Sequence, residues 1–143
     1  MEKLLISACL LGVDCKYDGG NNALPPETLA ALRARFELVP VCPEQLGGLP
    51  TPRVPSERRD GRVVTRGGAD VTEAFRRGAE AALRIAREHG CRRALLKTNS
   101  PSCGSGTIYD GRFSGTLIPG DGVTAELLKH ENFEVFGDIQ GLI

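Results

Sequence analysis

The sequence predicts a single α/β domain with an open, mostly parallel sheet, helices on both faces and a small hairpin. Two observations lead to this prediction. Short apolar runs alternate along the chain with segments of helical periodicity. The length of 143 residues suits one domain and is enough to bury about two thirds of the unfolded surface. No repeat, low-complexity tract or linker interrupts the chain, so we expect one domain over residues 1–143.

The first part of the chain is predicted to form two strands joined by a helix. Residues 3–8 are an apolar run typical of a buried strand. Pro25 and Pro26 then open a segment whose apolar residues recur at helical spacing. Residues 37–41 form a second apolar run, in which Pro40 favours an edge strand.

The middle of the chain is predicted to hold a long loop and a long helix. Residues 43–59 contain four prolines and a Gly-Gly pair, which argues against regular structure and for a functional loop. Residues 62–65 read as a brief strand. Asp70 is predicted to cap a helix with one apolar face, which ends at Gly90.

The last part is predicted to contain a strand, a loop of turn-forming residues, a hairpin, a helix and a final strand. Asp110-Gly111 indicates the hairpin turn, because this pair readily adopts positive φ angles. Asp121 is predicted to cap the helix. In chain order these segments cover residues 94–96, 98–104, 107–109 with 113–116, 123–130 and 134–136. Together the elements predict a three-layer, Rossmann-like arrangement.

Three cysteines follow the carboxyl ends of predicted strands, namely Cys9, Cys42 and Cys103. Ligands of an open parallel sheet bind at this edge, so we expect the three thiols to converge there. Buried structural cysteines belong inside strands and helices, whereas these lie in Gly- and Pro-rich loops. The total of five cysteines is odd, and a chain of this size does not need disulfides.

Soft thiolates favour zinc or iron–sulfur centres. The chain lacks the paired C-x-x-C knuckles of a zinc ribbon, so widely spaced single cysteines fit a cluster better. A fully ligated [4Fe–4S] centre takes four cysteines, so three would leave one iron open for catalysis. We interpret Cys15 as a packed loop residue, with a fourth ligand as the alternative. Cys91 precedes a strand and is interpreted as structural.

The chain resembles a known family over nearly its whole length, the TudS-type thiouracil and 4-thiouridine desulfidases. The resemblance rests on an ordered set of motifs. These are Ser7-Ala8-Cys9-Leu10-Leu11-Gly12, Cys15-Lys16-Tyr17-Asp18-Gly19, Val41-Cys42-Pro43-Glu44, Gly47-Gly48-Leu49-Pro50-Thr51-Pro52-Arg53, Gly68-Ala69-Asp70-Val71-Thr72 and Ser100-Pro101-Ser102-Cys103-Gly104. Lys16 stands where many relatives carry Arg.

The resemblance implies a [4Fe–4S] cluster held by Cys9, Cys42 and Cys103, whose open iron binds the sulfur of a thiolated pyrimidine during a non-redox desulfidation. It also implies that Glu44 and Ser100 handle substrate and water. Function still has to be argued from the site itself.

The residues support this chemistry independently. Glu44 lies two residues from a predicted ligand, where it can act as a general base toward water. Ser100 and Ser102 can hydrogen-bond the pyrimidine ring or the water. The alternative for Glu44 is a structural carboxylate that caps a turn or pairs with Arg53.

Arg53 and Lys97 are candidates for binding a nucleotide phosphate through charge-assisted hydrogen bonds. Tyr17 can stack on a pyrimidine ring. The alternatives are solvated cations and a partly buried aromatic ring.

The composition limits the classes of partner. Lys plus Arg and Asp plus Glu both number 18, so no basic field favours long nucleic acids, and no apolar run reaches the ~20 residues of a membrane span. We therefore expect a cytoplasmic desulfidase acting on thiouracil, 4-thiouridine or its monophosphate, and a homodimer is compatible with the sequence. Two other hypotheses are a non-catalytic metal or electron-transfer module closed by Cys15, and a thiol-redox protein.

Overall fold

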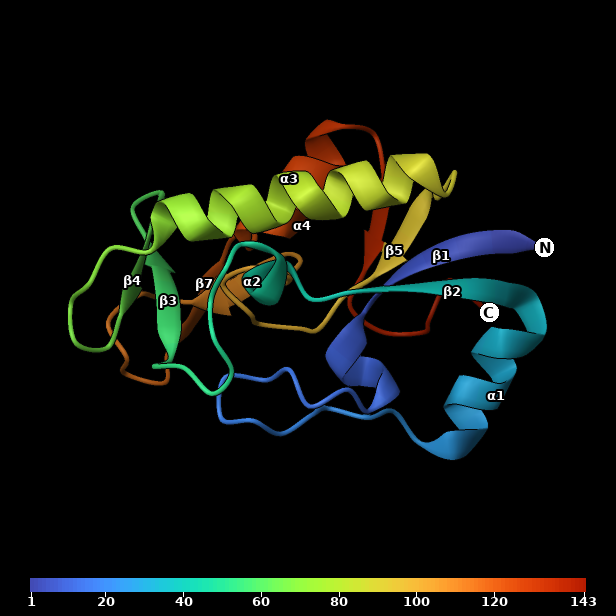
Figure 1. Ribbon diagram of the computed structural model, residues 1–143, viewed down its shortest axis with the longest axis horizontal. Coiled ribbons are helices and arrows are strands. Elements are labelled where there is room, and N and C mark those ends of the chain that lie inside the picture. Colours follow the sequence, from blue (N-terminus) through green and yellow to red (C-terminus); the bar gives the residue numbers. More distant parts are fainter.

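The central sheet of the computed structural model, which describes residues 1–143, has four parallel strands in the order β2-β1-β5-β8 (Figure 1). Their bounds are Glu2–Ser7 for β1, Phe36–Val41 for β2, Arg93–Leu95 for β5 and Glu134–Phe136 for β8. The predicted parallel sheet is therefore confirmed. Strand β2 lies at an edge, as Pro40 indicates, because a proline has no N–H to donate to a neighbouring strand.

Helices cover both faces of the sheet. Helices α3 (Thr72–Glu88) and α4 (Val123–His130) lie on one face, and α1 (Pro26–Arg35) lies on the other (Figure 1). Strand β1 serves both layers because its side chains alternate: Leu5 packs with α3 and α4, whereas Leu4 and Ile6 pack with Leu32 of α1.

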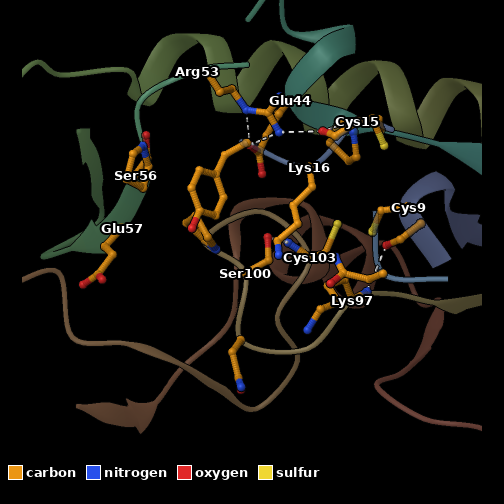
Figure 2. Close-up of a pocket in the computed structure, with 18 of the residues that line it drawn as sticks. Cys9, Cys15, Lys16, Glu44, Arg53, Ser56, Glu57, Lys97, Ser100 and Cys103 are labelled. Carbon is orange, nitrogen blue, oxygen red and sulfur yellow. Dashed lines mark hydrogen bonds and ion pairs between the residues drawn. The ribbon is translucent and has the colours of Figure 1, made fainter. Parts of the chain in front are cut away.

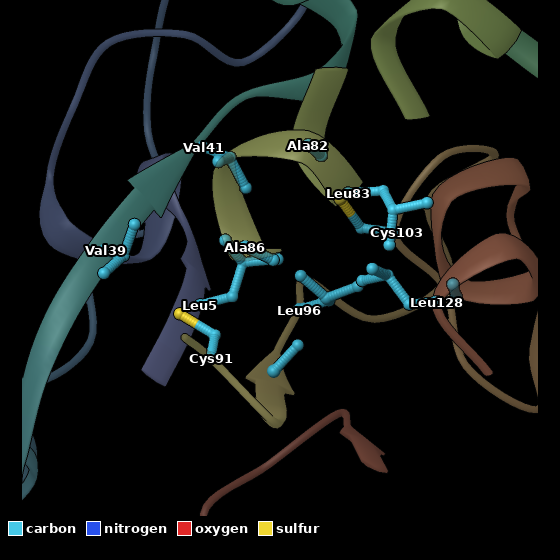
Figure 3. Packing of buried hydrophobic residues seen from close by; sticks show 12 residues of the cluster. Leu5, Val39, Val41, Ala82, Leu83, Ala86, Cys91, Leu96, Cys103 and Leu128 are labelled. Atoms are coloured by element: carbon cyan, nitrogen blue, oxygen red, sulfur yellow. The ribbon is translucent and has the colours of Figure 1, made fainter. Parts of the chain in front are cut away.

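The larger core cluster lies between the sheet and the helices α3 and α4 (Figure 3). It includes Leu5 and Val41 from the strands, Leu96 directly after β5, and Ala86 and Leu128 from the helices. Cys91 belongs to this cluster, in agreement with its interpretation as structural. The predicted three layers are thus formed by two hydrophobic clusters, one on each face of the sheet.

The segment 43–59 is more regular than its prolines indicate. It contains the short helix α2 (Pro43–Leu46) and the strand β3 (Ser56–Arg59), which pairs with β4 (Arg62–Thr65). The prediction of an irregular loop was wrong for two reasons. Pro43 occupies the first turn of a helix, where its missing N–H costs nothing, and Asp60-Gly61 forms a tight turn with both φ angles positive.

The second hairpin also differs from the prediction. Strand β6 (Thr107–Tyr109) pairs with β7 (Leu117–Pro119) rather than with residues 113–116. The loop between them is held by Glu57, whose Oε1 accepts hydrogen bonds from the backbone N–H groups of Gly111 (3.1 Å) and Phe113 (3.0 Å). Of the pair Asp110-Gly111 only Gly111 has a positive φ, so the expected two-residue turn does not form.

Asp70 was predicted to cap α3, but the N-cap position is held by Val71, which makes no side-chain cap hydrogen bond. Asp70 lies one residue earlier, and its Oδ1 accepts a hydrogen bond from the backbone N–H of Thr72, the first residue of the helix, at 2.9 Å. The helix ends at Glu88, two residues before Gly90, whose φ of 71° suits a glycine. None of the helices combines the length and the apolar character that crossing a membrane requires.

Candidate active site

The three predicted ligand cysteines follow three adjacent strands. Strand β1 lies between β2 and β5, so their carboxyl ends meet at one edge of the sheet. Cys9 lies on the 3₁₀ helix η1 (Ala8–Leu11) after β1, Cys42 directly follows β2, and Cys103 lies in the loop after β5. All three line one cavity of about 510 Å³. The structure therefore brings these thiols together as predicted.

Helix α2, which begins directly after Cys42, packs closely against α3 at two glycines. A Cβ atom at Gly78 of α3 would lie 1.8 Å from the carbonyl oxygen of Pro43, and one at Gly47 would lie 2.0 Å from that of Ala74. Only glycine permits such a close approach of two backbones. The Cys42-Pro43-Glu44 segment is thereby held against the longest helix of the fold.

The loop that carries Cys103 is seated on α4. The first N–H groups of this helix, those of Val123 and Thr124, donate to the carbonyl oxygens of Pro101 and Ser102, both at 2.8 Å. These contacts satisfy helix donors that otherwise lack partners. Asp121 was predicted to cap α4, which was wrong: its Oδ1 accepts from the backbone of Gly106 and from Lys129 instead.

Burial favours the protonated form of Cys9 and Cys103. Burial raises the pKa of Cys9 and raises the pKa of Cys103 to about 12, against hydrogen bonds from Asn22 and Ser7 respectively. A bound metal draws such protons off, because thiols ligate as thiolates.

The thiol-rich cavity fits an iron–sulfur cluster. No three His, Cys, Asp or Glu side chains lie close enough to hold a single metal ion. A cluster places several iron and sulfide atoms between its ligands, so thiols spread around one cavity suit it.

Cys15 lies in the same cavity and is buried. Its carbonyl oxygen accepts a long hydrogen bond from the Cys42 thiol, 3.8 Å away. Burial and the nearby Cys42 raise the pKa of Cys15. Four thiols therefore border the cavity, and the sequence interpretation of Cys15 as a packed loop residue agrees with its burial without deciding whether it binds metal.

Glu44 and Arg53 form an enclosed ion pair at one side of the cavity (Figure 2). The Nε atom of Arg53 donates a hydrogen bond to Oε2 of Glu44 at 2.7 Å, and the Nη2 atom lies 2.7 Å from the same oxygen as the ion-pair contact. The exposed fractions of the two side chains are only 18% for Glu44 and 8% for Arg53. The pairing of Glu44 with Arg53, which the sequence analysis gave as an alternative, is therefore present. The second carboxylate oxygen of Glu44, Oε1, is left for other partners.

The two candidate serines occupy different environments. Ser100 lines the cavity, and its Oγ accepts hydrogen bonds from the backbone N–H groups of Ser102 and Cys103, both at 3.0 Å. Ser102 is fully buried outside the cavity lining, and its Oγ bonds the hydroxyl of Thr124 at 2.8 Å. The structure thus brings Ser100 to the site but not Ser102.

Lys97 and Tyr17 both line the cavity, as the predicted substrate contacts require. The Nζ atom of Lys97 bonds the carbonyl oxygen and hydroxyl of Thr98 at 3.3 and 3.2 Å, and Figure 2 shows it on the side opposite Arg53. Tyr17 is 42% exposed. Both side chains are therefore accessible to a ligand.

Several residues of the cavity were not identified from the sequence. Ser7 and Asn22 line the cavity with Cys103 and Cys9, and the motif around Cys9 could have indicated Ser7. Arg66 and Phe113 also line the cavity, with the guanidinium 5.4 Å from the ring centre. Arg66 directly follows β4, and Phe113 lies between β6 and β7. No local sequence pattern indicates that either residue belongs to the site.

Comparisons with known proteins agree with this site. The family described as 2-thiouracil desulfurase matches residues 4–139. The uncharacterised protein YbbK of Bacillus subtilis (strain 168) is 43% identical over 145 residues, which cover 94% of this chain and 95% of that protein. A solved structure of a [4Fe–4S]-dependent thiouracil desulfidase, TudS, is 49% identical, with a TM-score of 0.93 over 98% of this chain and 93% of that one. The chain belongs to the 2-thiouracil desulfurase family.

Proposed function

We propose that this protein is a [4Fe–4S]-dependent desulfidase that replaces the sulfur of a thiolated pyrimidine by oxygen and releases sulfide. Its family and the TudS structure, a [4Fe–4S]-dependent thiouracil desulfidase, support this activity. The observation that carries the proposal is the presence of thiols from three adjacent strand ends beside the Glu44 carboxylate in one cavity.

In this proposal Cys9, Cys42 and Cys103 hold the cluster and leave one of its irons without a protein ligand. When bound, the cluster supplies a Lewis-acidic iron for the sulfur of the substrate. Cys15 lies beside Cys42 as a thiol that does not ligate.

Glu44 is proposed as the general base. Its Oε2 is held by Arg53, so Oε1 can accept a proton from the water that attacks the carbon bearing the sulfur. The water oxygen forms a bond to that carbon, the carbon–sulfur bond breaks, and the sulfur leaves as hydrogen sulfide. No electron transfer is needed for this balance. General-base catalysis of this kind typically contributes about 10² to 10⁴ in rate.

Ser100 is proposed as a hydrogen-bond donor to the substrate or the water. Two backbone N–H groups occupy the acceptor positions of its Oγ, so its own O–H is the remaining group that can act toward the cavity. Its position is fixed by the same two bonds.

The cavity suits a small thiolated base, nucleoside or nucleotide. Its volume of about 510 Å³ is in the range of small-molecule sites. Tyr17 is proposed to flank the pyrimidine ring, and Lys97 to bind an anionic substituent. We expect thiouracil, 4-thiouridine or its monophosphate as substrate. A cytoplasmic location, a single domain and a homodimer stay predictions.

The proposal is tested by anaerobic purification, iron and sulfide analysis, and an assay of sulfide release from thiouracil and 4-thiouridine. A desulfidase binds iron and inorganic sulfide and turns over at least one of these compounds. Substantial iron without turnover would favour the non-catalytic module closed by Cys15, which the comparisons do not support. A metal-free protein with a reversible disulfide would favour a thiol-redox role.

A further inference from the structure

The guanidinium of Arg53 is engaged by partners within the protein. Its Nε donates to Oε2 of Glu44, and its Nη2 donates to the carbonyl oxygen of Cys15 at 2.9 Å and lies 2.7 Å from Oε2 of Glu44 as an ion pair. Its Nη1 donates to the carbonyl oxygen of Pro50 at 3.2 Å and to Oγ1 of Thr51 at 3.0 Å. All three guanidinium nitrogens are thus engaged within the protein, by four hydrogen bonds and the ion-pair contact with Glu44. This engagement argues against the phosphate-binding role predicted from the sequence.

The partners of Arg53 come from three separate segments of the chain, two of which line the cavity. They are Glu44 on α2, the turn at Pro50 and Thr51, and the loop of Cys15. The backbone N–H of Arg53 adds a fourth connection, since it donates to the carbonyl oxygen of Tyr17 at 2.7 Å. Through these hydrogen bonds, Arg53 therefore links the loop that contains Cys15 and Tyr17 to helix α2, which carries Glu44.

The contact with Glu44 leaves the carboxylate in a defined orientation. Both Nε and Nη2 meet the same oxygen, Oε2, which fixes this oxygen on the side of Arg53. Figure 2 shows the two side chains together at one wall of the cavity, with Cys15 beside them. Because both contacts go to Oε2, this oxygen is held beside the guanidinium, and Oε1 is the carboxylate oxygen that Arg53 leaves free.

We propose that Arg53 is a positioning residue of the desulfidase site, which orients Glu44 toward the substrate and holds the loop of Cys15 and Tyr17 as a wall of the cavity. This inference rests on the proposed function, because Glu44 must serve the reaction. It assigns Arg53 no contact with the substrate, so its effect on turnover does not depend on whether the substrate carries a phosphate.

The kinetic test compares Arg53→Met and Arg53→Lys with thiouracil and with 4-thiouridine monophosphate. We expect Arg53→Met to lower kcat about 100-fold for both substrates and to change KM less than about threefold, because the base loses its orientation. Arg53→Lys keeps a charge but lacks the fork, so we expect a loss of about tenfold. Iron content should match the wild type in both variants.

A double variant tests whether Arg53 acts through Glu44. In a Glu44→Gln background, Arg53→Met should lower kcat by less than about threefold further, because residues that act together are not additive. Arg87→Met is the matched control, since Arg87 forms an ion pair with Glu131 at 2.9 Å between α3 and α4. We expect this control to keep wild-type kinetics.

Hydrogen exchange provides a measurement that does not require turnover. Arg53→Met should speed the exchange of the Lys16 and Gly19 amides, which are bonded within the loop of Cys15, whereas Arg53→Lys should do so less and Arg87→Met not at all. Thermal unfolding of each variant shows whether the whole domain remains folded.

The outcomes separate the inference from the proposed function. The positioning role would be overturned if the loss of activity were confined to the monophosphate, or if kcat were unchanged with both substrates. It would also be overturned if the effects of Arg53→Met and Glu44→Gln were fully additive, or if both Arg53 variants lost their iron. Unchanged loop exchange in Arg53→Met would overturn it as well. If the iron-loaded wild type releases no sulfide, the proposed function fails, and faster loop exchange in Arg53→Met alone would still support the structural link.

Discussion

Gly78 on α3 and Pro43 on α2 meet backbone to backbone. The position that a Cβ of Gly78 would occupy lies 1.8 Å from the carbonyl oxygen of Pro43. Pro43 stands between Cys42, a proposed ligand, and Glu44, the proposed base. The geometry of the site therefore depends on a glycine that does not itself line the cavity.

We predict that Gly78→Ala destabilises the protein and displaces the Cys42-Pro43-Glu44 segment. Helix propensity alone would favour alanine by about 1 kcal/mol. The clash with a backbone oxygen outweighs this gain, with an overpacking cost of about 1 to 3 kcal/mol. Urea unfolding and iron content measure the two effects. Arg84→Ala, at an exposed position of the same helix, is the control, and equal stability of Gly78→Ala and wild type would contradict the prediction.

Glu44→Gln tests the proposed base while keeping the shape of the side chain. We expect kcat to fall by about 10² to 10⁴ because an amide cannot take the proton of the attacking water. Iron content and thermal stability should change little in comparison. Glu27→Gln, in the first turn of α1, is the control. A Glu44→Gln enzyme with full activity would show that another group is the base.

Ser100→Ala and Ser102→Ala should have different consequences. Removing the Ser100 hydroxyl takes a donor from the cavity, so we expect kcat to fall about 10- to 100-fold and Ser100→Thr to restore part of it. Removing the Ser102 hydroxyl leaves Thr124 without its buried partner, so stability should fall by about 1 to 3 kcal/mol while kcat changes less. Steady-state kinetics and urea unfolding of both variants measure this contrast, and the reverse pattern would refute it.

We predict that Asp70 makes the stability of the folded protein depend on pH in the acid range. Hydrogen bonds from Thr72 and the contact with Arg62 lower the pKa of Asp70 to about 2. A lowered pKa in the folded state stabilises the protein above the ordinary value near 4, and this contribution disappears as pH falls through about 2. The difference in urea midpoint between wild type and Asp70→Ala should therefore be largest above pH 4 and shrink toward pH 2. Glu80→Ala, on the exposed side of α3, should show no such trend.

The sequence predicted the sheet, its helices and the convergence of three cysteines well. Apolar runs and helical spacing report directly on burial, and the carboxyl ends of parallel strands share one edge whatever the connections are. The two hairpins were harder to place. Both contain Asp-Gly pairs, but only Asp60-Gly61 forms the tight turn, because contacts of Glu57 with the backbone shape the loop around Gly111.

The site residues show a similar limit. Ser100 and Ser102 lie two positions apart in one motif, yet only Ser100 lines the cavity, because Thr124 of a distant helix takes the other hydroxyl. Arg53 was assigned to the substrate from its charge, and only the structure shows that all three of its guanidinium nitrogens already have partners within the protein. Side-chain direction and partner saturation are tertiary properties that local spacing does not encode.

The most direct test of the account is the iron content and sulfide release of Cys15→Ala beside Cys42→Ala, both prepared without oxygen. If Cys9, Cys42 and Cys103 hold the cluster, Cys15→Ala retains about four irons per chain together with turnover, whereas Cys42→Ala loses both. Loss of the iron and of the activity from Cys15→Ala would contradict the account, because it would make Cys15 a fourth ligand and leave no iron open to the substrate.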